Sequence, residues 1–264
     1  MISFEPLHIL FQIGSFKVFT WGFMFVIGFL VALLLIWREA KKQKIQDKHL
    51  YNIALLVLIG AIIGPRLVFV LEHLAYFIAN PVEIIATWQG GITSYGTFLS
   101  LLFVWLYTRK QKDITFTQIL DLVAPYLLLA IAITRVGCFL NWDDYGSVSQ
   151  LPWAIKVGDD FARHPTQLYE SLYSLASFFI LLGFKKIREK GRDTRFKKLL
   201  ENPSSLFLFF LLFYSFFRFF NDFLREYETI FLGLALSQWI CLVLFALSSA
   251  MLCFRVRESS HIVG

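Results

Sequence analysis

The sequence predicts an all-α integral membrane protein with seven transmembrane helices and a small extracytoplasmic head. Hydrophobic residues make up 57% of the 264 residues, and 30 residues are phenylalanine, whereas apolar residues make up roughly 45–50% of an ordinary soluble domain. The mean hydropathy is +0.63, and a chain of this length has room for about seven apolar spans of ~20 residues. The net charge of +6 reflects basic residues clustered between apolar runs, which is typical of topology signals and does not indicate nucleic-acid binding.

The apolar runs set the order of the predicted spans. They cover residues 18–37, 50–71, 91–108, 117–140, 168–184, 204–222 and 232–253. The loops 38–48, 109–113 and 185–198 hold most of the 25 lysines and arginines, so the positive-inside rule predicts that these loops are cytoplasmic. An extracytoplasmic N-terminus and a cytoplasmic C-terminus follow, and that arrangement requires an odd number of spans.

The segments outside the spans favour a single domain. The N-terminal segment lacks the basic region and the small-residue cleavage site of a signal peptide. Residues 4–16 form either an amphipathic arm along the outer interface or an ordered lead-in to the first span. Residues 141–167 are polar and rich in turn-forming residues, and we expect them to form the head. Because no linker or internal repeat is found, residues 1–264 are interpreted as one transmembrane domain that contains this head.

Three arginines interrupt the apolar runs, namely Arg66, Arg135 and Arg218. A charge near the centre of a bilayer costs at least roughly 2.5–3.5 kcal/mol, and such residues usually face the interior of the helix bundle or a polar cavity. The three arginines therefore predict a buried basic site that suits an anionic lipid headgroup. The alternative is that each arginine pairs with a backbone carbonyl or a carboxylate and serves packing alone.

Two glycine-containing segments lie at the ends of spans. Residues 90–97 (GGITSYGT) open the third span, where they can present backbone N–H groups to an anion or permit close helix packing. Residues 135–146 (RVGCFLNWDDYG) close the fourth span. Arg135 lies about one and a half turns inside that end, where it can hold a phosphate bidentately or form a structural pair with Asp143.

Polar residues also enter the fifth span, in the segment 164–170 (HPTQLYE). Pro165 favours a first helical turn, and on a helix His164, Gln167 and Glu170 would fall near one face. Such residues are costly at the entry of a span unless they are used or satisfied.

The sixth span carries a stripe of polar residues. Tyr214, Arg218, Asp222 and Arg225 recur at helical spacing. We expect Arg218 to pair with Asp222 and Arg225 to be free at the outer interface.

The cysteines and histidines indicate neither a disulfide framework nor a metal site. The sequence holds 3 cysteines, and Cys241 and Cys253 are interpreted as apolar filler in the last span. The 5 histidines are scattered, and none pairs with another histidine or a cysteine at ligand spacing. We therefore expect no metal and no cofactor.

The motif HPTQLYE, with GGITSYGTFL before it and RVGCFLNWDDYG between the two, resembles the prolipoprotein diacylglyceryl transferase family. The resemblance covers most of the chain, from TWGFMFVIGF in the first span to LSQW in the last. It implies seven spans in the bacterial inner (cytoplasmic) membrane. It also implies transfer of the diacylglyceryl group from phosphatidylglycerol to the lipobox cysteine thiol of a prolipoprotein signal peptide, with release of glycerol phosphate.

The resemblance assigns roles residue by residue. Arg135 matches the family's essential arginine in its signature loop, and Gly146 matches the glycine that ends this loop. Arg218 matches the arginine near the lipid headgroup, and Tyr214 matches a tyrosine on the same stripe. Residues 164–170 match the family's histidine-to-glutamate motif.

The sequence departs from the family's pattern at several of these positions. Tyr95 stands where the family has a histidine, and Cys138 where it has an asparagine. Asp143 and Asp222 replace glutamates, and Trp21 replaces a tyrosine. A phenol, with a reference pKa of ~10, is a poor base at neutral pH, so the chain needs another route to a substrate thiolate.

Two routes to the thiolate are open. His164 is the nearest candidate base that the sequence retains, and Arg218 could stabilise the thiolate directly as a neighbouring cation. Covalent use of Cys138 is a lesser alternative, because a lone cysteine is more often a small apolar residue.

These patterns predict a divergent transferase of this family. The predicted catalytic residues are Tyr95, Arg135, His164 and Arg218. The predicted lipid-binding residues are Arg66, Gly90, Gly91, Asn141, Gly146, Gln167, Tyr169, Glu170, Tyr214 and Asp222. The alternative is a non-catalytic paralogue that binds anionic lipid or lipoprotein precursors. A small-solute transporter is less favoured, because the sequence shows no pattern of paired broken helices.

Overall fold

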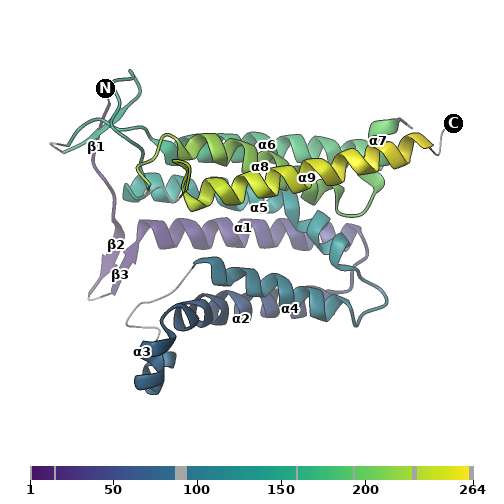
Figure 1. Ribbon diagram of the computed structural model, residues 1–264, viewed down its shortest axis with the longest axis horizontal. Helices are drawn as coiled ribbons and strands as arrows, with labels where there is room; N and C mark the ends of the chain where they lie inside the picture. The colour runs from purple at the N-terminus through teal and green to yellow at the C-terminus, as the bar shows by residue number, and fades with distance from the viewer. Residues whose placement is uncertain are drawn as a thin grey trace. The chain divides into compact units, whose positions relative to one another are not determined.

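The computed structural model describes residues 2–14, 16–86, 94–158, 160–192, 194–227 and 231–261. The chain divides into two compact units, one of residues 1–36 with 120–264 and the other of residues 37–119. Figure 1 shows that helices dominate both units, as the apolar composition predicts. The interpretation of residues 1–264 as one domain stays a prediction.

The first unit is a bundle of helices, of which α1, α5, α6 and α8 share one hydrophobic core. Its helices are α1 (Thr20–Lys42), α5 (Phe116–Asn141), α6 (Thr166–Lys190), α7 (Arg195–Glu201), α8 (Ser205–Asp222) and α9 (Leu236–His261). Buried Leu128 of α5, Leu181 of α6 and Phe210 of α8 pack in one cluster. Figure 1 shows α6, α8 and α9 side by side. This packing fixes where the polar residues at the helix ends lie.

Short strands tie the N-terminal segment into the first unit. They are β1 (Ile2–Phe4), β2 (Ile9–Ile13), β3 (Phe16–Phe19) and β4 (Ile155–Val157). β1 pairs in parallel with β4, and β2 pairs with β3 in an antiparallel hairpin that exposes Phe11 and Ile13. Much of the segment 4–16 is therefore strand, and β4 lies within the segment 141–167 that was expected to form the head.

The second unit is built on a close helix crossing. Its elements are α2 (Asp47–Glu72), α3 (Leu74–Ala79), the 3-10 helices η1 (Pro81–Ile85) and η3 (Ser94–Phe98), and α4 (Leu99–Thr108). A Cβ atom added at Gly64 of α2 would lie 1.9 Å from the carbonyl oxygen of Gly96 in η3. Gly96 therefore permits close packing, one of the two alternatives for the segment 90–97, and anion binding by this segment stays a prediction. Near the start of α2, buried His49 lies 2.8 Å from a carboxylate oxygen of Asp113.

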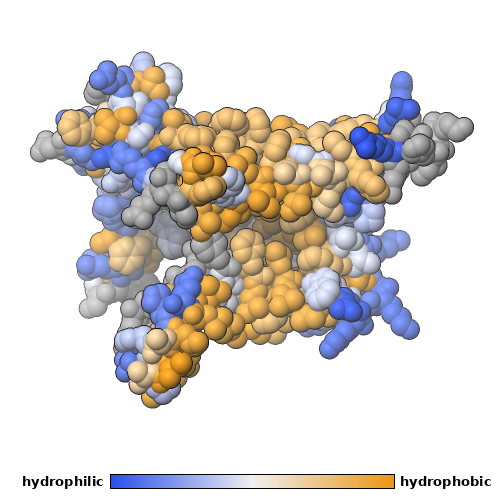
Figure 2. All heavy atoms as spheres, in the orientation of Figure 1, coloured by the Kyte–Doolittle hydropathy of each residue, from blue (hydrophilic) through white to orange (hydrophobic). Residues whose placement is uncertain are grey.

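Five of the described helices are long and apolar enough to cross a membrane. They are α1, α2, α5, α8 and α9. Figure 2 shows hydrophobic residues along the sides of the helices and hydrophilic residues gathered at their ends. The chain is therefore a helical membrane protein, as the sequence predicts.

The other two predicted spans also contain helices, but α6 is less apolar than the five helices above and α4 is shorter. α6 has 25 residues, and its buried polar side chains, among them Gln167, Glu170 and Ser174, lower its hydropathy. α4 has 10 residues and follows η3. Seven transmembrane helices and an extracytoplasmic head thus stay predictions.

Candidate active site

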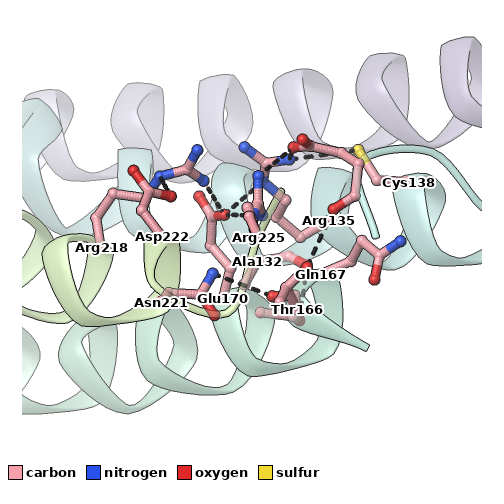
Figure 3. Close-up of polar contacts among 12 residues, drawn as sticks. Ala132, Arg135, Cys138, Thr166, Gln167, Glu170, Arg218, Asn221, Asp222 and Arg225 are labelled. Atoms are coloured by element: carbon pink, nitrogen blue, oxygen red, sulfur yellow. Dashed lines mark hydrogen bonds and ion pairs between the residues drawn. The ribbon is translucent and has the colours of Figure 1, made fainter. Parts of the chain in front are cut away.

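Three arginines, called the arginine cluster below, converge on the carboxylate of Glu170 (Figure 3). Arg135 Nε lies 3.1 Å from Glu170 Oε2, and Arg225 Nη2 lies 3.0 Å from the same oxygen. Arg218 Nη1 forms an ion pair with that oxygen as well. The Glu170 side chain is 0% exposed, and a buried charge is costly unless it is paired. Glu170 alone does not neutralise three guanidiniums, so further carboxylates are needed around them.

Three helices bring these side chains together. Arg135 lies near the C-terminal end of α5, Glu170 lies near the start of α6, and Arg218 lies near the C-terminal end of α8. Since α5, α6 and α8 share the core of the first unit, these ends meet. Two of the arginines that interrupt apolar runs are therefore gathered at one place.

Arg225 does not lie where the sequence analysis expected it. It was predicted to be free at the outer interface, but 1% of its side chain is exposed and it binds Glu170. The prediction was wrong because α8 ends at Asp222, so helical spacing no longer applies to Arg225. The turn that carries Arg225 folds back onto the chain after α5, where the Ser147 N–H donates to the Leu224 carbonyl at 2.7 Å.

The rest of the stripe follows helical spacing. Arg218 Nε lies 2.9 Å from Asp222 Oδ1, so the expected pair is confirmed. The Tyr214 hydroxyl donates to Glu170 Oε1 at 2.9 Å. Arg218 Nη2 also donates to the Tyr227 hydroxyl at 3.1 Å. Arg218 is therefore held on several sides and has a fixed orientation.

Asp144 is a further carboxylate of this site. Its Oδ2 accepts hydrogen bonds from Arg135 Nη1 at 2.6 Å and from Arg225 Nη1 at 2.5 Å. The Tyr227 hydroxyl donates to its Oδ1 at 3.2 Å. Burial acts to raise the pKa of Asp144, but the guanidiniums of Arg225 and Arg135 outweigh it and hold the pKa below its ordinary value. Asp144 is therefore ionised at neutral pH.

The carboxylate partners of Arg135 are thus Asp144 and Glu170, and the alternative pair with Asp143 is wrong. The Asp143 carboxylate accepts a hydrogen bond from the Asn141 side-chain amide instead. The physical reason lies in the backbone, because α5 ends at Asn141 and φ is 57° at Trp142 and 63° at Asp144. Helical spacing from Arg135 therefore does not continue into this turn.

Gly146 allows three segments of the chain to approach closely, the turn after α5, the start of α6 and the turn after α8. A Cβ atom at Gly146 would lie 2.5 Å from the Leu224 carbonyl oxygen and 2.7 Å from the Cβ of His164. Its N–H donates to the His164 carbonyl at 2.9 Å. A larger residue would separate the turn that carries Asp144 from the turn that carries Arg225.

His164 lies just outside α6, because the helix begins at Thr166. Its Nδ1 lies 3.3 Å from the Tyr169 hydroxyl, which accepts a hydrogen bond from Trp153 Nε1 at 2.8 Å. Burial lowers the pKa of His164, so its imidazole is neutral at pH 7 and can accept a proton. Glu170, farther along α6, faces the arginine cluster instead.

Other predicted site residues belong to the second unit. Buried Arg66 donates to the backbone carbonyls of Glu83 and Ile84. The predicted residues Gly90 and Gly91 lie outside the described residues, and so does the side chain of Tyr95. Their predicted roles stay predictions.

The donors of the arginine cluster suit an oxyanion. Guanidinium groups bind phosphate and carboxylate bidentately. Cys138 is buried, 3.9 Å from Arg135 Nη1. Within the described part of the chain, no group of three histidine, cysteine, aspartate or glutamate side chains could hold a metal ion.

The predicted site residues did not include three members of this site, Asp144, Arg225 and Tyr227, although Arg225 was placed on the polar stripe of the sixth span. Asp144 had a weak signal, since it adjoins Asp143 in a polar turn. Tyr227 had none, because it lies beyond the end of α8 and reaches the arginines through a turn.

The fold and this site define a helical membrane protein with an anion site lined by guanidiniums. The sequence profile of the family described as prolipoprotein diacylglyceryl transferase matches residues 8–254. The chain therefore belongs to the prolipoprotein diacylglyceryl transferase family, and the resemblance predicted from its motifs is confirmed.

Relatives named phosphatidylglycerol–prolipoprotein diacylglyceryl transferase cover most of the chain. The one from Methylobacillus flagellatus is 33% identical over 256 residues, which are 91% of this chain and 92% of the relative. The one from Streptococcus agalactiae is 31% identical over 257 residues, 94% of this chain and 95% of the relative. The one from Geobacter sulfurreducens is 28% identical over 223 residues, 83% and 82% of the two chains. These names support the transferase interpretation over the non-catalytic paralogue.

Proposed function

We propose that this chain transfers the diacylglyceryl group of phosphatidylglycerol to the lipobox cysteine of prolipoproteins and releases glycerol phosphate. The observation that carries this proposal is the arginine cluster, buried at the ends of helices whose sides are apolar. Such a place suits a lipid whose chains lie among the helices and whose phosphate reaches guanidinium donors. Family membership supports the same reaction.

The negative charge that develops on the phosphate in this reaction matches the positive guanidiniums of the site. The substrate sulfur forms a bond to the glyceryl carbon while the bond from that carbon to the phosphate oxygen breaks. The electron pair of the broken bond goes to the phosphate, and the thiol proton goes to a base. Because the departing phosphate gains negative charge, fixed cations around it stabilise the transition state.

The described residues suggest a division of roles. Arg135 and Arg225 would hold the lipid phosphate, since both already bind one carboxylate oxygen of Asp144. Arg218 would stabilise the leaving group or the incoming thiolate, and His164 would accept the thiol proton. The roles of Arg66 and Tyr95 rest on the sequence alone.

The membrane arrangement is part of the proposal. We propose seven spans in the bacterial inner membrane, with the loops 38–48, 109–113 and 185–198 in the cytoplasm and the head 141–167 outside. α6, with 25 residues, would be about 37 Å long at 1.5 Å per residue, longer than the ~30 Å hydrocarbon core. Single cysteines at Lys42 and Arg192 should resist an impermeant maleimide added to intact cells; ready labelling would contradict this topology.

Complementation tests the activity itself. A strain depleted of its own diacylglyceryl transferase should grow when it expresses this chain, and its lipoproteins should carry thioether-linked lipid. The Arg135→Ala variant, expressed at the same level, serves as the control and should fail. Membrane expression of the wild-type chain without growth or labelling would favour the paralogue that only binds lipid.

A further inference from the structure

Asp144 differs from the other carboxylates that bind the arginine cluster. The side chains of Glu170 and Asp222 are 0% exposed, whereas that of Asp144 is 34% exposed. Glu170 and Asp222 lie on helices α6 and α8, but Asp144 lies in the turn after α5. Two carboxylates are therefore fixed parts of the site, and one can turn toward solvent.

We propose that Asp144 occupies the phosphate position of the lipid-free site and is displaced by the phosphodiester of the incoming lipid. The inference rests on the proposed function, because that function supplies the lipid. Asp144 Oδ2 lies 2.6 Å from Arg135 Nη1 and 2.5 Å from Arg225 Nη1. Guanidinium groups that bind a carboxylate oxygen can also bind a phosphate oxygen, because both are anionic acceptors.

The charges of the site support displacement by a monoanion. Among the described residues of the site, the three arginines face three carboxylates, Glu170, Asp222 and Asp144. When Asp144 turns away, two carboxylates remain against three guanidiniums. The single positive charge that is left matches the single negative charge of a phosphodiester. The Asp144 carboxylate thus keeps the empty site neutral and competes with the lipid.

The backbone around Asp144 is held, so only its side chain needs to move. The Thr166 hydroxyl donates to the Asp144 carbonyl at 3.0 Å, and Gln167 Nε2 donates to the Asp143 carbonyl at 2.7 Å. The Tyr227 hydroxyl, which donates to Asp144 Oδ1 at 3.2 Å, would then be available to a phosphate oxygen. Displacement therefore exchanges one acceptor for another without unfolding the turn.

Binding of phosphatidylglycerol to the purified full-length protein in zwitterionic detergent tests this inference. The Asp144→Asn variant keeps the shape but lacks the charge, and it should bind phosphatidylglycerol about tenfold more tightly, the size of a charge-assisted contact. Asp144→Glu keeps a competing carboxylate and should not show the gain. Asp160→Asn, which removes the carboxylate from an ion pair with Arg163, is the matched control and should bind as the wild type does.

Diacylglycerol, which has no phosphate, separates the effect of charge from a general change. Its affinity should be the same for the wild type and Asp144→Asn. Equal or weaker phosphatidylglycerol binding by Asp144→Asn would overturn the inference and leave the proposed function intact. A wild-type protein that binds no phosphatidylglycerol would overturn the proposed function itself. If Asp144→Asn does not fold, Asp144→Ser takes its place, and failure of both to fold would show that Asp144 is a structural part of the site.

Discussion

Arg66 and Arg135 both interrupt apolar helices, and the hydrogen bonds and ion pairs described for the two arginines differ in kind. Arg66 donates to the backbone carbonyls of Glu83 and Ile84, which are fixed by the local fold. Arg135 binds two carboxylates, and one of them, Asp144, is partly exposed. A guanidinium bound to backbone carbonyls stabilises a chain crossing, whereas one bound to a displaceable carboxylate can exchange it for a substrate. We therefore propose that the two arginines have different roles, Arg66 in stability and Arg135 in lipid binding.

Loss of Arg135 should give the largest effect. Arg135→Ala removes a partner from Glu170 and Asp144 and leaves buried charge uncompensated. We expect transfer to a lipobox peptide to fall by roughly 10²–10³-fold, as for breaking one partner of a buried pair. Thioether formation in phosphatidylglycerol micelles measures this. Lys197→Ala, which breaks a partly exposed pair with Glu201, should change the rate less than about threefold.

Arg225 extends the comparison, because its removal should have a small effect according to the sequence and a large effect according to the structure. Helical spacing predicts that Arg225 is exposed at the outer interface. Loss of an ion pair at such a place costs roughly 0–1 kcal/mol. In the structure its side chain is 1% exposed and binds Asp144 and Glu170. Arg225→Ala should therefore reduce transfer nearly as much as Arg135→Ala does in the same assay. A mild effect would show that Arg225 is not part of the working site.

The two expectations for Arg225 differ because only some contacts of the site can be predicted from the sequence. The pairing of Arg218 with Asp222 follows from one period of a helix, and the structure contains it. The place of Arg225 does not follow, because it depends on where α8 ends. Asp144 could not be chosen over Asp143 for the same reason. Turns with left-handed backbone and long-range partners are set by tertiary packing, which a local pattern does not encode.

The fold was predictable to a similar extent. Long apolar runs with basic loops predict helices and their order, and each of the seven predicted segments contains a helix in the structure. The strands β1 and β4 were not expected, because short strands pair residues that lie far apart in the chain. The polar face of α6 does not have the composition of a typical span, and its charged residue Glu170 is paired by Tyr214 and Arg135 of other helices.

Replacement of His164 should give the next largest loss of transfer, and the wild-type rate should depend on pH. His164→Gln keeps size and hydrogen bonding but removes the proton acceptor, so transfer should fall roughly 100-fold if His164 is the base. Burial lowers the pKa of His164, so the wild-type imidazole stays neutral at pH 7. The wild-type rate should fall only at pH below the ordinary histidine value of ~6.5. A rate and pH profile unchanged by His164→Gln would leave thiolate stabilisation by Arg218 as the better account.

Arg66 should show the smallest effect on lipid binding. Arg66→Ala leaves the Glu83 and Ile84 carbonyls without this donor, so we expect a lower thermal stability. The affinity for phosphatidylglycerol should change less than about threefold, well below one decade in Kd. A loss of affinity as large as that of Arg135→Ala would erase the difference between the two arginines and support the lipid-binding role predicted for Arg66.

Direct contact between the lipid phosphate and the arginine cluster is the central claim. Solid-state NMR can measure the dipolar coupling between the ³¹P nucleus of bound phosphatidylglycerol and ¹⁵N-labelled arginine guanidiniums in the full-length protein. Since guanidinium nitrogens lie about 2.7–2.9 Å from the oxygens that they bind, we predict strong coupling in the wild type and a clear weakening in Arg135→Lys/Arg225→Lys, which keeps Arg218 of the cluster. Bound lipid whose phosphorus shows no coupling to arginine nitrogens in the wild type would contradict the account.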